Sequence, residues 1–175
     1  MMVIRNILGL LLSMVSGLMP IVGDTAGADV VLKGNVTEQT CAASAGSDNF
    51  SVDLGSWAAK TLNGATGKVS AEKPFSIKLE GCPAVAISII FTGKGADGSS
   101  DLLAIDSGTD VAKNVAIELL NSDMSRLGVS EASKPVTADA NGNAIFNFYA
   151  RYISTASQIS AGQANASSVF TLNYN

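Results

Sequence analysis

The sequence contains no histidine. This absence removes the commonest general base, the usual hydrolase triads and the usual zinc sites. Only 15% of the residues are charged, and acidic residues outnumber basic ones by 15 to 11. That balance argues against a nucleic-acid partner, because nucleic-acid binding depends on Lys and Arg contacts to phosphate. The sequence also lacks a P-loop and a G-x-G-x-x-G motif followed by a helix.

Carboxylate pairs are the remaining candidates for catalysis. Asp97 and Asp101, and likewise Asp106 and Asp110, are close in sequence. Both pairs lie among Gly and Ser residues that are typical of solvated loops, so we interpret them as turn residues. We therefore predict that the protein is not an enzyme.

The run DANGN (139–143) places oxygen ligands at alternate positions, as a calcium-binding loop does. An EF-hand loop that began at its Asp would need Gly at the sixth position and Glu at the twelfth. Those positions hold Ala144 and Ala150. We therefore predict a hairpin turn between Thr137 and the strand at Phe146, with no metal and no cofactor.

The first 28 residues have the features of a signal peptide. One positive charge, Arg5, precedes an apolar run over residues 7–22, and Ala26 and Ala28 have the A-x-A spacing of a cleavage site. The alternative is a transmembrane helix, since the run reaches about the minimum length for a span. Two glycines and a proline within the run, and the A-x-A that follows it, favour cleavage after Ala28 and export of a mature chain that begins at Asp29.

Export makes the two cysteines, Cys41 and Cys82, interpretable as a pair. An oxidising compartment permits a disulfide, and one bridge leaves no odd thiol. Two free, buried thiols are the alternative. A metal site would need further nitrogen or sulfur ligands, which a histidine-free chain does not provide. The predicted bridge is structural, and it would restrict the unfolded chain by ~4 kcal/mol in the entropy model.

Short stretches of alternating apolar and polar residues recur along the mature chain, separated by Gly, Asn, Asp and Ser turn signals. They predict seven or eight strands, in segments 30–36, 50–55, 74–82, 84–93, 114–120, 143–152 and 168–174. The longest non-alternating stretch, 56–74, is a predicted crossover between sheets with room for one helical turn. Because no strand–helix–strand rhythm is present, the pattern predicts an all-β, immunoglobulin-like antiparallel sandwich.

The last predicted strand continues almost to the final residue, Asn175. Phe170, Leu172 and Tyr174 lie on its apolar face, and no later segment is expected to pair with its second edge. An alternating stretch that contains a glycine, VVLKGNV, precedes Cys41 by a few residues. The second cysteine closes the strand IKLEGC, and the chain ends in NFYARY…AGQANASSVFTLNYN, with a tyrosine next to last.

Together these features resemble the type 1 fimbrial subunits, or pilins, of the chaperone–usher pathway. The similarity runs through essentially the whole mature chain and is most like a minor tip-fibrillum subunit, although the major rod subunits share much of this pattern. The resemblance implies an incomplete immunoglobulin-like sandwich that lacks its last strand and is completed by donor-strand addition. It divides the chain into a signal peptide (1–28), an N-terminal donor-strand extension (29–38) and a pilin domain (39–175).

The resemblance also implies roles for particular residues. Phe170, Leu172 and Tyr174 match the strand that lines the open groove and meets the chaperone, and Cys41 and Cys82 match the disulfide of the family. The implied donor strand presents Val30, Leu32, Gly34 and Val36, with Gly34 at the point where the groove floor tolerates no side chain. The alternative is that this segment is an ordinary first strand of its own domain.

The implied function is that of a structural subunit of an adhesive fimbria, exported through the periplasm to the cell surface. The implied partners are a periplasmic chaperone that first lends a strand, the outer-membrane usher, and neighbouring fimbrial subunits whose extensions replace that strand. No nucleic acid, small-molecule substrate or cofactor is implied. A secreted glycan-binding sandwich is the alternative function, although Trp57 and three tyrosines offer a poor stacking platform for sugar rings.

Overall fold

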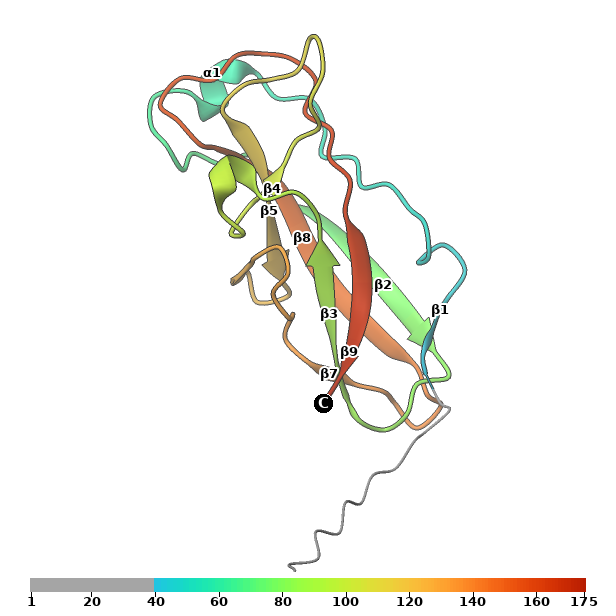
Figure 1. Cartoon of the computed structure of the whole chain (residues 1–175). Coiled ribbons are helices and arrows are strands. Elements are labelled where there is room, and N and C mark those ends of the chain that lie inside the picture. The colour runs from blue at the N-terminus through green and yellow to red at the C-terminus, as the bar shows by residue number, and fades with distance from the viewer. Residues whose placement is uncertain (1–39) are drawn as a thin grey trace, which may run out of the picture. The chain divides into compact units, whose positions relative to one another are not determined.

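The computed structural model describes residues 40–175. The predicted signal peptide and the predicted donor residues Val30, Leu32, Gly34 and Val36 lie outside the described residues. The described part of the chain is built almost entirely from strands, with one short helix, α1 (Ala59–Leu62), and one 3-10 turn, η1 (Ala96–Gly98) (Figure 1). The strands are β1 (Ala42–Ala43), β2 (Lys73–Glu80), β3 (Ala86–Thr92), β4 (Leu103–Ala104), β5 (Val115–Asn121), β6 (Arg126–Leu127), β7 (Val136–Thr137), β8 (Ala144–Ser154) and β9 (Val169–Tyr174).

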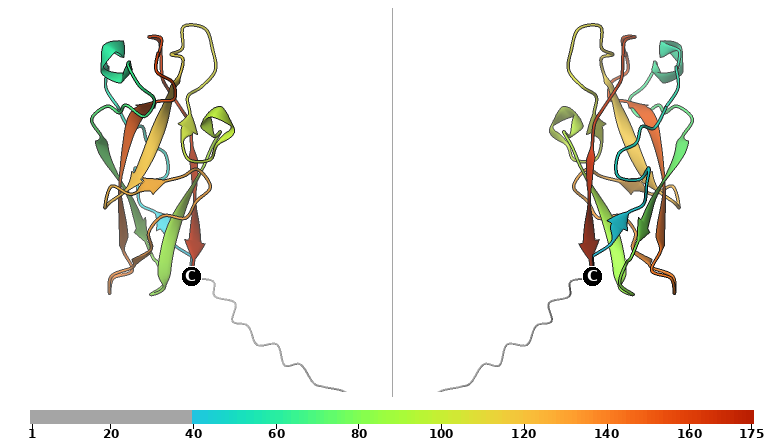
Figure 2. Two further views of the ribbon diagram at one scale, coloured as in Figure 1. Left: turned by 90° about the vertical axis from the view of Figure 1, so that its left-hand side faces the viewer. Right: turned by 90° about the vertical axis from the view of Figure 1, so that its right-hand side faces the viewer.

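These strands form two antiparallel sheets. The larger sheet has the order β1-β2-β8-β5-β4, with β6 also paired to β5, and the smaller sheet has the order β7-β3-β9. Figure 2 shows the two sheets packed face to face as the layers of a sandwich. The predicted immunoglobulin-like antiparallel architecture is thus confirmed.

The strands follow the alternation of their sequences. In β2, Ile77 and Leu79 are buried between exposed Ser76, Lys78 and Glu80. The paired strand β8 likewise buries every second residue over its first half. β5 is buried on both faces, because it lies in the middle of the larger sheet and loops cover its outer side. The apolar faces meet in one core, whose aromatic centre has ring centroids 5.1–6.2 Å apart and consists of Phe75, Phe91, Phe146 and Phe148.

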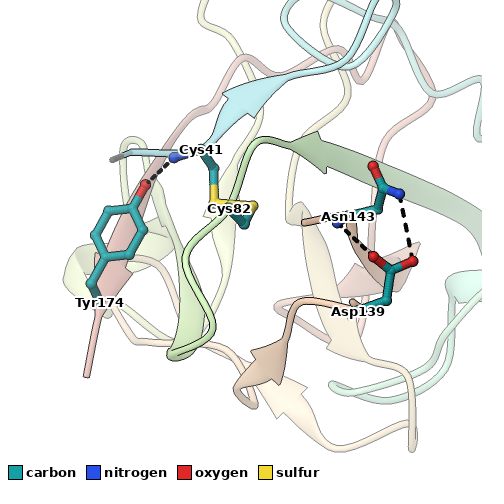
Figure 3. Close-up of a disulfide and its surroundings, with 5 residues drawn as sticks. All are labelled: Cys41, Cys82, Asp139, Asn143 and Tyr174. Atoms are coloured by element: carbon teal, nitrogen blue, oxygen red, sulfur yellow. Dashed lines mark hydrogen bonds between the residues drawn. A yellow bond between two sulfur atoms is a disulfide. The ribbon is translucent and has the colours of Figure 1, made fainter. Parts of the chain in front are cut away.

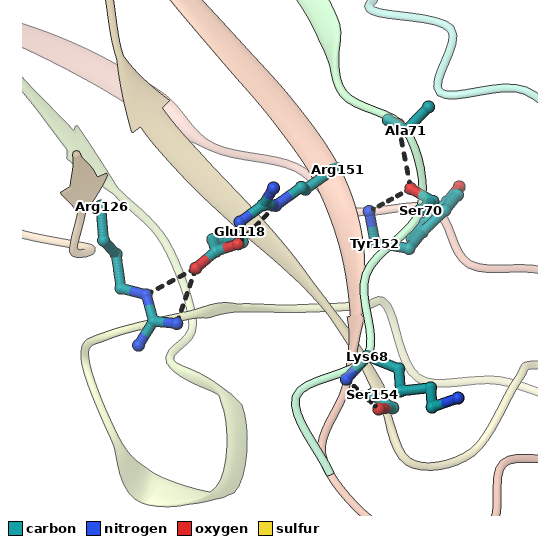
Figure 4. Close-up of polar contacts among 8 residues, drawn as sticks. All are labelled: Lys68, Ser70, Ala71, Glu118, Arg126, Arg151, Tyr152 and Ser154. Atoms are coloured by element: carbon teal, nitrogen blue, oxygen red, sulfur yellow. Dashed lines mark hydrogen bonds and ion pairs between the residues drawn. The ribbon is translucent and has the colours of Figure 1, made fainter. Parts of the chain in front are cut away.

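The outer face of the larger sheet buries one charge, the carboxylate of Glu118 on β5 (Figure 4). Arg151, its cross-strand neighbour on β8, donates from Nε to Oε2 at 2.6 Å. Arg126 on β6 donates from Nε and Nη2 to Oε1 at 2.7 and 2.6 Å. A buried carboxylate without partners would be strongly destabilising, and these two guanidinium groups explain why this one is tolerated.

Two sequence-based predictions need correction. Residues 50–55 are not a strand: they belong to an extended segment without a regular ladder. The 139–143 run does form a tight turn, closed by hydrogen bonds from Asp139 N to Asn143 O at 2.8 Å and from Gly142 N to Asp139 O at 3.0 Å. However, the turn is not a β-hairpin, because β7 pairs with β3 in one sheet while β8 pairs with β2 and β5 in the other.

The predicted crossover over residues 56–74 contains α1, the one helical turn for which the sequence left room. None of the helical residues within 40–175 forms a segment long and apolar enough to span a membrane.

Candidate functional site

An open groove of about 1370 Å³ lies between the two sheets, beside β9. Ala43 and residues 48–57 form one wall, and residues 159–170 form the other. Apolar side chains from both sheets make up its floor, including Phe75, Phe91, Leu103, Ile117 and Leu119. Side chains of the hydrophobic core therefore line the groove.

The wall formed by β9 has an unpaired backbone edge. Six residue pairs join β9 to β3, from Val169 opposite Thr92 to Tyr174 opposite Ile87. Within residues 40–175, no strand pairs with the other edge of β9. Free N–H and C=O groups along that edge are a template for one more strand.

The opposite wall leaves the larger sheet after β1. Ser44 and Ser47 still bond to β2, where Ser44 N donates to Lys78 O at 2.9 Å and Lys78 N donates to Ser47 Oγ at 3.0 Å. The chain then turns and runs along the groove over residues 48–57. Phe50 and Trp57 on this wall are each 37% exposed, and Trp57 Nε1 donates to Leu54 O at 2.8 Å. The wall thus presents two large aromatic side chains that are partly exposed.

A glycine shapes the far part of the β9 wall. Gly162 lies against the loop before β5, so that a Cβ atom on it would be 2.3 Å from the backbone C of Val111. Backbone bonds from Gln163 N to Asp110 O and from Ala112 N to Gln163 O, both 2.8 Å, hold the two segments together. Sequence reasoning missed both Gly162 and the groove role of Trp57. Neither has a period-2 pattern that would have revealed it.

Tyr152 lines the groove, and so does Asp53. Burial, assisted by the negative charge of Asp53, raises the pKa of Tyr152 above its ordinary value. The hydroxyl therefore stays protonated at neutral pH and donates to Ala164 O at 3.1 Å. In residues 40–175, no group of three or more His, Cys, Asp or Glu residues is placed to hold a metal ion.

The three residues predicted from the last strand take different positions. Phe170 lines the groove. Leu172, like Phe170, packs against the core, but it is not part of the groove lining. Tyr174 lies at the end of β9, where its hydroxyl accepts a hydrogen bond from Cys41 N at 2.9 Å (Figure 3).

The predicted disulfide between Cys41 and Cys82 is present. It ties the residue before β1 to the turn after β2, and Cys82 N also donates to Gly142 O at 2.9 Å in the turn before β8. The N-terminal end of the described domain is therefore fixed beside the C-terminal end of β9.

The sequence model of the fimbrial protein family matches residues 30–175. The chain belongs to the fimbrial protein family. It is 45% identical over 147 residues to the fimbrial-like protein FimF of Salmonella typhimurium, and the matched region covers 84% of each chain. It is 34% identical over 158 residues to a type-1 fimbrial protein subunit of Serratia marcescens, and the matched region covers 85% of this chain and 87% of that protein.

Solved structures of fimbrial proteins have the same fold. A type I fimbria protein of Burkholderia pseudomallei superposes with a TM-score of 0.60 at 28% identity, over 79% of this chain and 91% of that one. The P pilus rod subunit PapA superposes with a TM-score of 0.64 at 21% identity, over 77% of this chain and 99% of that one. The protein is a structural subunit of a fimbria, as the sequence predicted.

Proposed function

We propose that this fimbrial subunit polymerises by donor-strand exchange and has no enzymatic activity. The open groove beside the unpaired edge of β9 carries the proposal. The groove would accept the N-terminal extension, residues 29–38, of a neighbouring subunit. A periplasmic chaperone would fill the groove first, and the exchange would take place at the outer-membrane usher. Removal of the signal peptide 1–28 would precede both steps and leave Asp29 as the first residue.

The physical chemistry of the groove favours such an occupant. Val30, Leu32 and Val36 would each gain roughly 1.5–3 kcal/mol by burial against the apolar floor. The inserted backbone would also satisfy the free N–H and C=O groups along β9, at about 0.5–1.5 kcal/mol for each hydrogen bond. This is strand addition at a sheet edge, in which the backbone supplies affinity and pockets for alternate side chains supply specificity.

The position of Cys41 favours insertion between molecules over insertion within one. Every strand pair between the named strands is antiparallel, so we expect the inserted strand to run antiparallel to β9. The extension of the same chain is held at Cys41, beside the end of β9. From that anchor it could enter its own groove only parallel to β9. A neighbouring chain has no such restriction, and identical head-to-tail joints then produce an open filament that reaches the cell surface.

Replacing Gly34 with Leu tests the proposal. The variant should fold and bind the chaperone as the wild type does, because the added bulk lies on the extension. It should fail when this extension must enter the groove of another subunit, at a cost of ~1–3 kcal/mol or more from overpacking. Lys33→Leu places the same leucine side chain on the opposite face of the segment and is the matched control.

Fluorescence can follow the exchange, because Trp57 is the only tryptophan of the chain and lines the groove. Chaperone-bound wild-type subunit is mixed with each extension peptide, and the change in Trp57 emission gives the rate. Slow exchange of Gly34→Leu alone is the expected result. Equal rates for wild type, Gly34→Leu and Lys33→Leu would show that this segment is not the donor strand.

A further inference from the structure

The groove is open along most of its length, but it is closed at the end where β9 finishes. Its lining includes Ala43 near this end, and from β9 it includes Val169 and Phe170 at the start of the strand but neither Leu172 nor Tyr174. Beyond Phe170, the Tyr174 side chain crosses from β9 to the other wall, where its hydroxyl accepts the hydrogen bond from Cys41 N (Figure 3). The hollow therefore ends at a polar contact between the two walls.

Both partners in this contact are held by the rest of the domain. Cys41 is bound to Cys82 through the disulfide. On the other side, Tyr174 is paired with Ile87 of β3, and the next residue, Asn175, donates its backbone N–H to Ala86 O at 2.9 Å. The hydrogen bond thus joins two anchored segments.

The open part of the groove is long enough for the proposed donor strand without the closed end. Its wall over residues 48–57 is ten residues long, or ~33 Å at the rise of a strand, whereas the seven residues 30–36 of a donor strand would span ~23 Å. The strand can therefore enter without displacing Tyr174.

We propose that the hydrogen bond from Cys41 N to the Tyr174 hydroxyl stays closed in the assembled fibre and sets the register of the inserted strand. Tyr174 is then a positioning residue, which stops the N-terminal end of an antiparallel donor. This inference rests on the proposed function. A stop is useful because a slip by one residue would turn the apolar side chains of the donor outward. A slip by two would bring Leu32 or Val36 to the place of Gly34, where the proposed function requires a position without a side chain.

Hydrogen exchange of the Cys41 amide tests whether the contact persists. The amide is measured in the purified mature subunit, with and without a saturating peptide of residues 29–38. We expect slow exchange in both states. In Tyr174→Phe, which keeps the ring but removes the acceptor, exchange should be about tenfold faster. Tyr149→Phe, at a partly buried position outside the groove, is the matched control and should leave exchange unchanged.

A series of peptides of different lengths tests whether the hydrogen bond between Cys41 and Tyr174 sets the register of the donor. If this bond only stabilised the domain, its loss would not change how affinity depends on peptide length. The parent peptide is compared with one lengthened by Ser-Val at its N-terminus and one lengthened by the same residues at its C-terminus. In the wild type, the N-terminal addition should change the Kd by less than about twofold. In Tyr174→Phe, the same peptide should bind about fivefold more tightly than the parent, because two more residues can pair with β9. The C-terminal addition should have the same effect in both proteins.

The possible failures are distinguishable. A wild-type subunit that binds none of the peptides would contradict the proposed function and this inference with it. Binding with the same length dependence in the wild type and in Tyr174→Phe would overturn the inference alone. So would loss of Cys41 amide protection in the wild type when the parent peptide binds, since the contact would then open on insertion.

Discussion

Residues 50–55, FSVDLG, and residues 75–80, FSIKLE, have almost the same pattern of apolar and polar side chains. The second segment belongs to β2, whereas the first is an extended wall of the groove without a ladder. The side chains that point toward the core are also buried to different extents in the two segments. Ile77 is completely buried, but Val52 at the equivalent position is only partly buried. Identical alternation has therefore produced a strand in one place and not in the other.

The two segments differ in the strands that lie beside them. β2 pairs with β1 on one edge and with β8 on the other, whereas residues 50–55 have no strand on either edge within the described part of the chain. Alternation determines which side chains point toward the core, but the hydrogen bonds of a strand come from a partner. We infer that residues 50–55 have the sequence of a strand whose partner comes from another molecule.

Filling the groove with a donor strand should reduce the difference between residues 50–55 and β2 more than any other change. A donor peptide of residues 29–38 would give residues 50–55 a neighbour on the groove side, so backbone amides of this segment that face the groove should exchange about a hundredfold more slowly with solvent. Amides in the middle of β2, which are already paired, should keep their rates. Hydrogen exchange followed by NMR measures both segments in one sample. Unchanged exchange over 50–55 in a peptide-saturated subunit would mean that the occupant pairs with β9 alone.

Truncating the equivalent side chains of β2 and of residues 50–55 to alanine should change the free energy of unfolding by different amounts, an effect smaller than that of filling the groove. Ile77→Ala should lower the free energy of unfolding by about 2–5 kcal/mol, because it leaves a cavity in the core. Val52→Ala removes fewer atoms from a partly buried site and should cost less than about 1 kcal/mol in the free subunit. Urea unfolding of the mature subunit measures both. Similar losses would mean that the groove wall is packed as tightly as β2 before a donor arrives.

The disulfide supports one edge of β2, since it joins the residue before β1 to the turn after β2. Cys41→Ser should therefore lower the free energy of unfolding by about 2–4 kcal/mol. Cys82→Ser and the double variant should lose the same amount, because each of the three changes removes the same bond. Thermal unfolding of the three proteins, with free-thiol labelling of the wild type as a check, gives the comparison. A double variant that is clearly less stable than either single variant would indicate a role for the thiols apart from the bridge.

The smallest effect on stability is expected from a change in the turn that leads into β8, the second neighbour of β2. The backbone N–H of Asn143, helped by that of Asn141, lowers the pKa of the Asp139 carboxyl below its ordinary value. A lowered folded-state pKa means that ionised Asp139 stabilises the fold above about pH 4, and that this contribution is lost as the pH falls through the folded-state pKa. Asp139→Asn should remove this small dependence. Unfolding curves at pH 6 and pH 3 test it, and equal pH dependence in both proteins would contradict it.

Much of the fold could be read from the sequence. The segments around Phe75, Ile87, Ile117, Phe146 and Leu172 all lie in strands near their predicted positions, because each has a long alternating or continuously apolar run and finds a partner within the chain. The disulfide was also predictable, since an exported chain with two cysteines has one possible pairing. The fimbrial motifs then indicated where the groove lies.

The details of the groove were less accessible. Leu172 and Tyr174 share the alternation of Phe170, yet only Phe170 lines the groove. Gly162 is needed because the backbone of Val111 passes within reach of any Cβ atom there, and no pattern in the sequence brings these two residues together.

The sequence by itself determined which faces of its strands are apolar, which cysteines pair and which family the chain resembles. These properties depend on side-chain chemistry and on spacing along one chain. Only the tertiary structure decided that residues 50–55 stay unpaired within the described domain and that Tyr174 meets Cys41 across the end of the groove. The physical reason is that hydrogen bonds and close contacts join residues far apart in sequence, such as the 133 positions between Cys41 and Tyr174, and their formation depends on which segments the fold brings together.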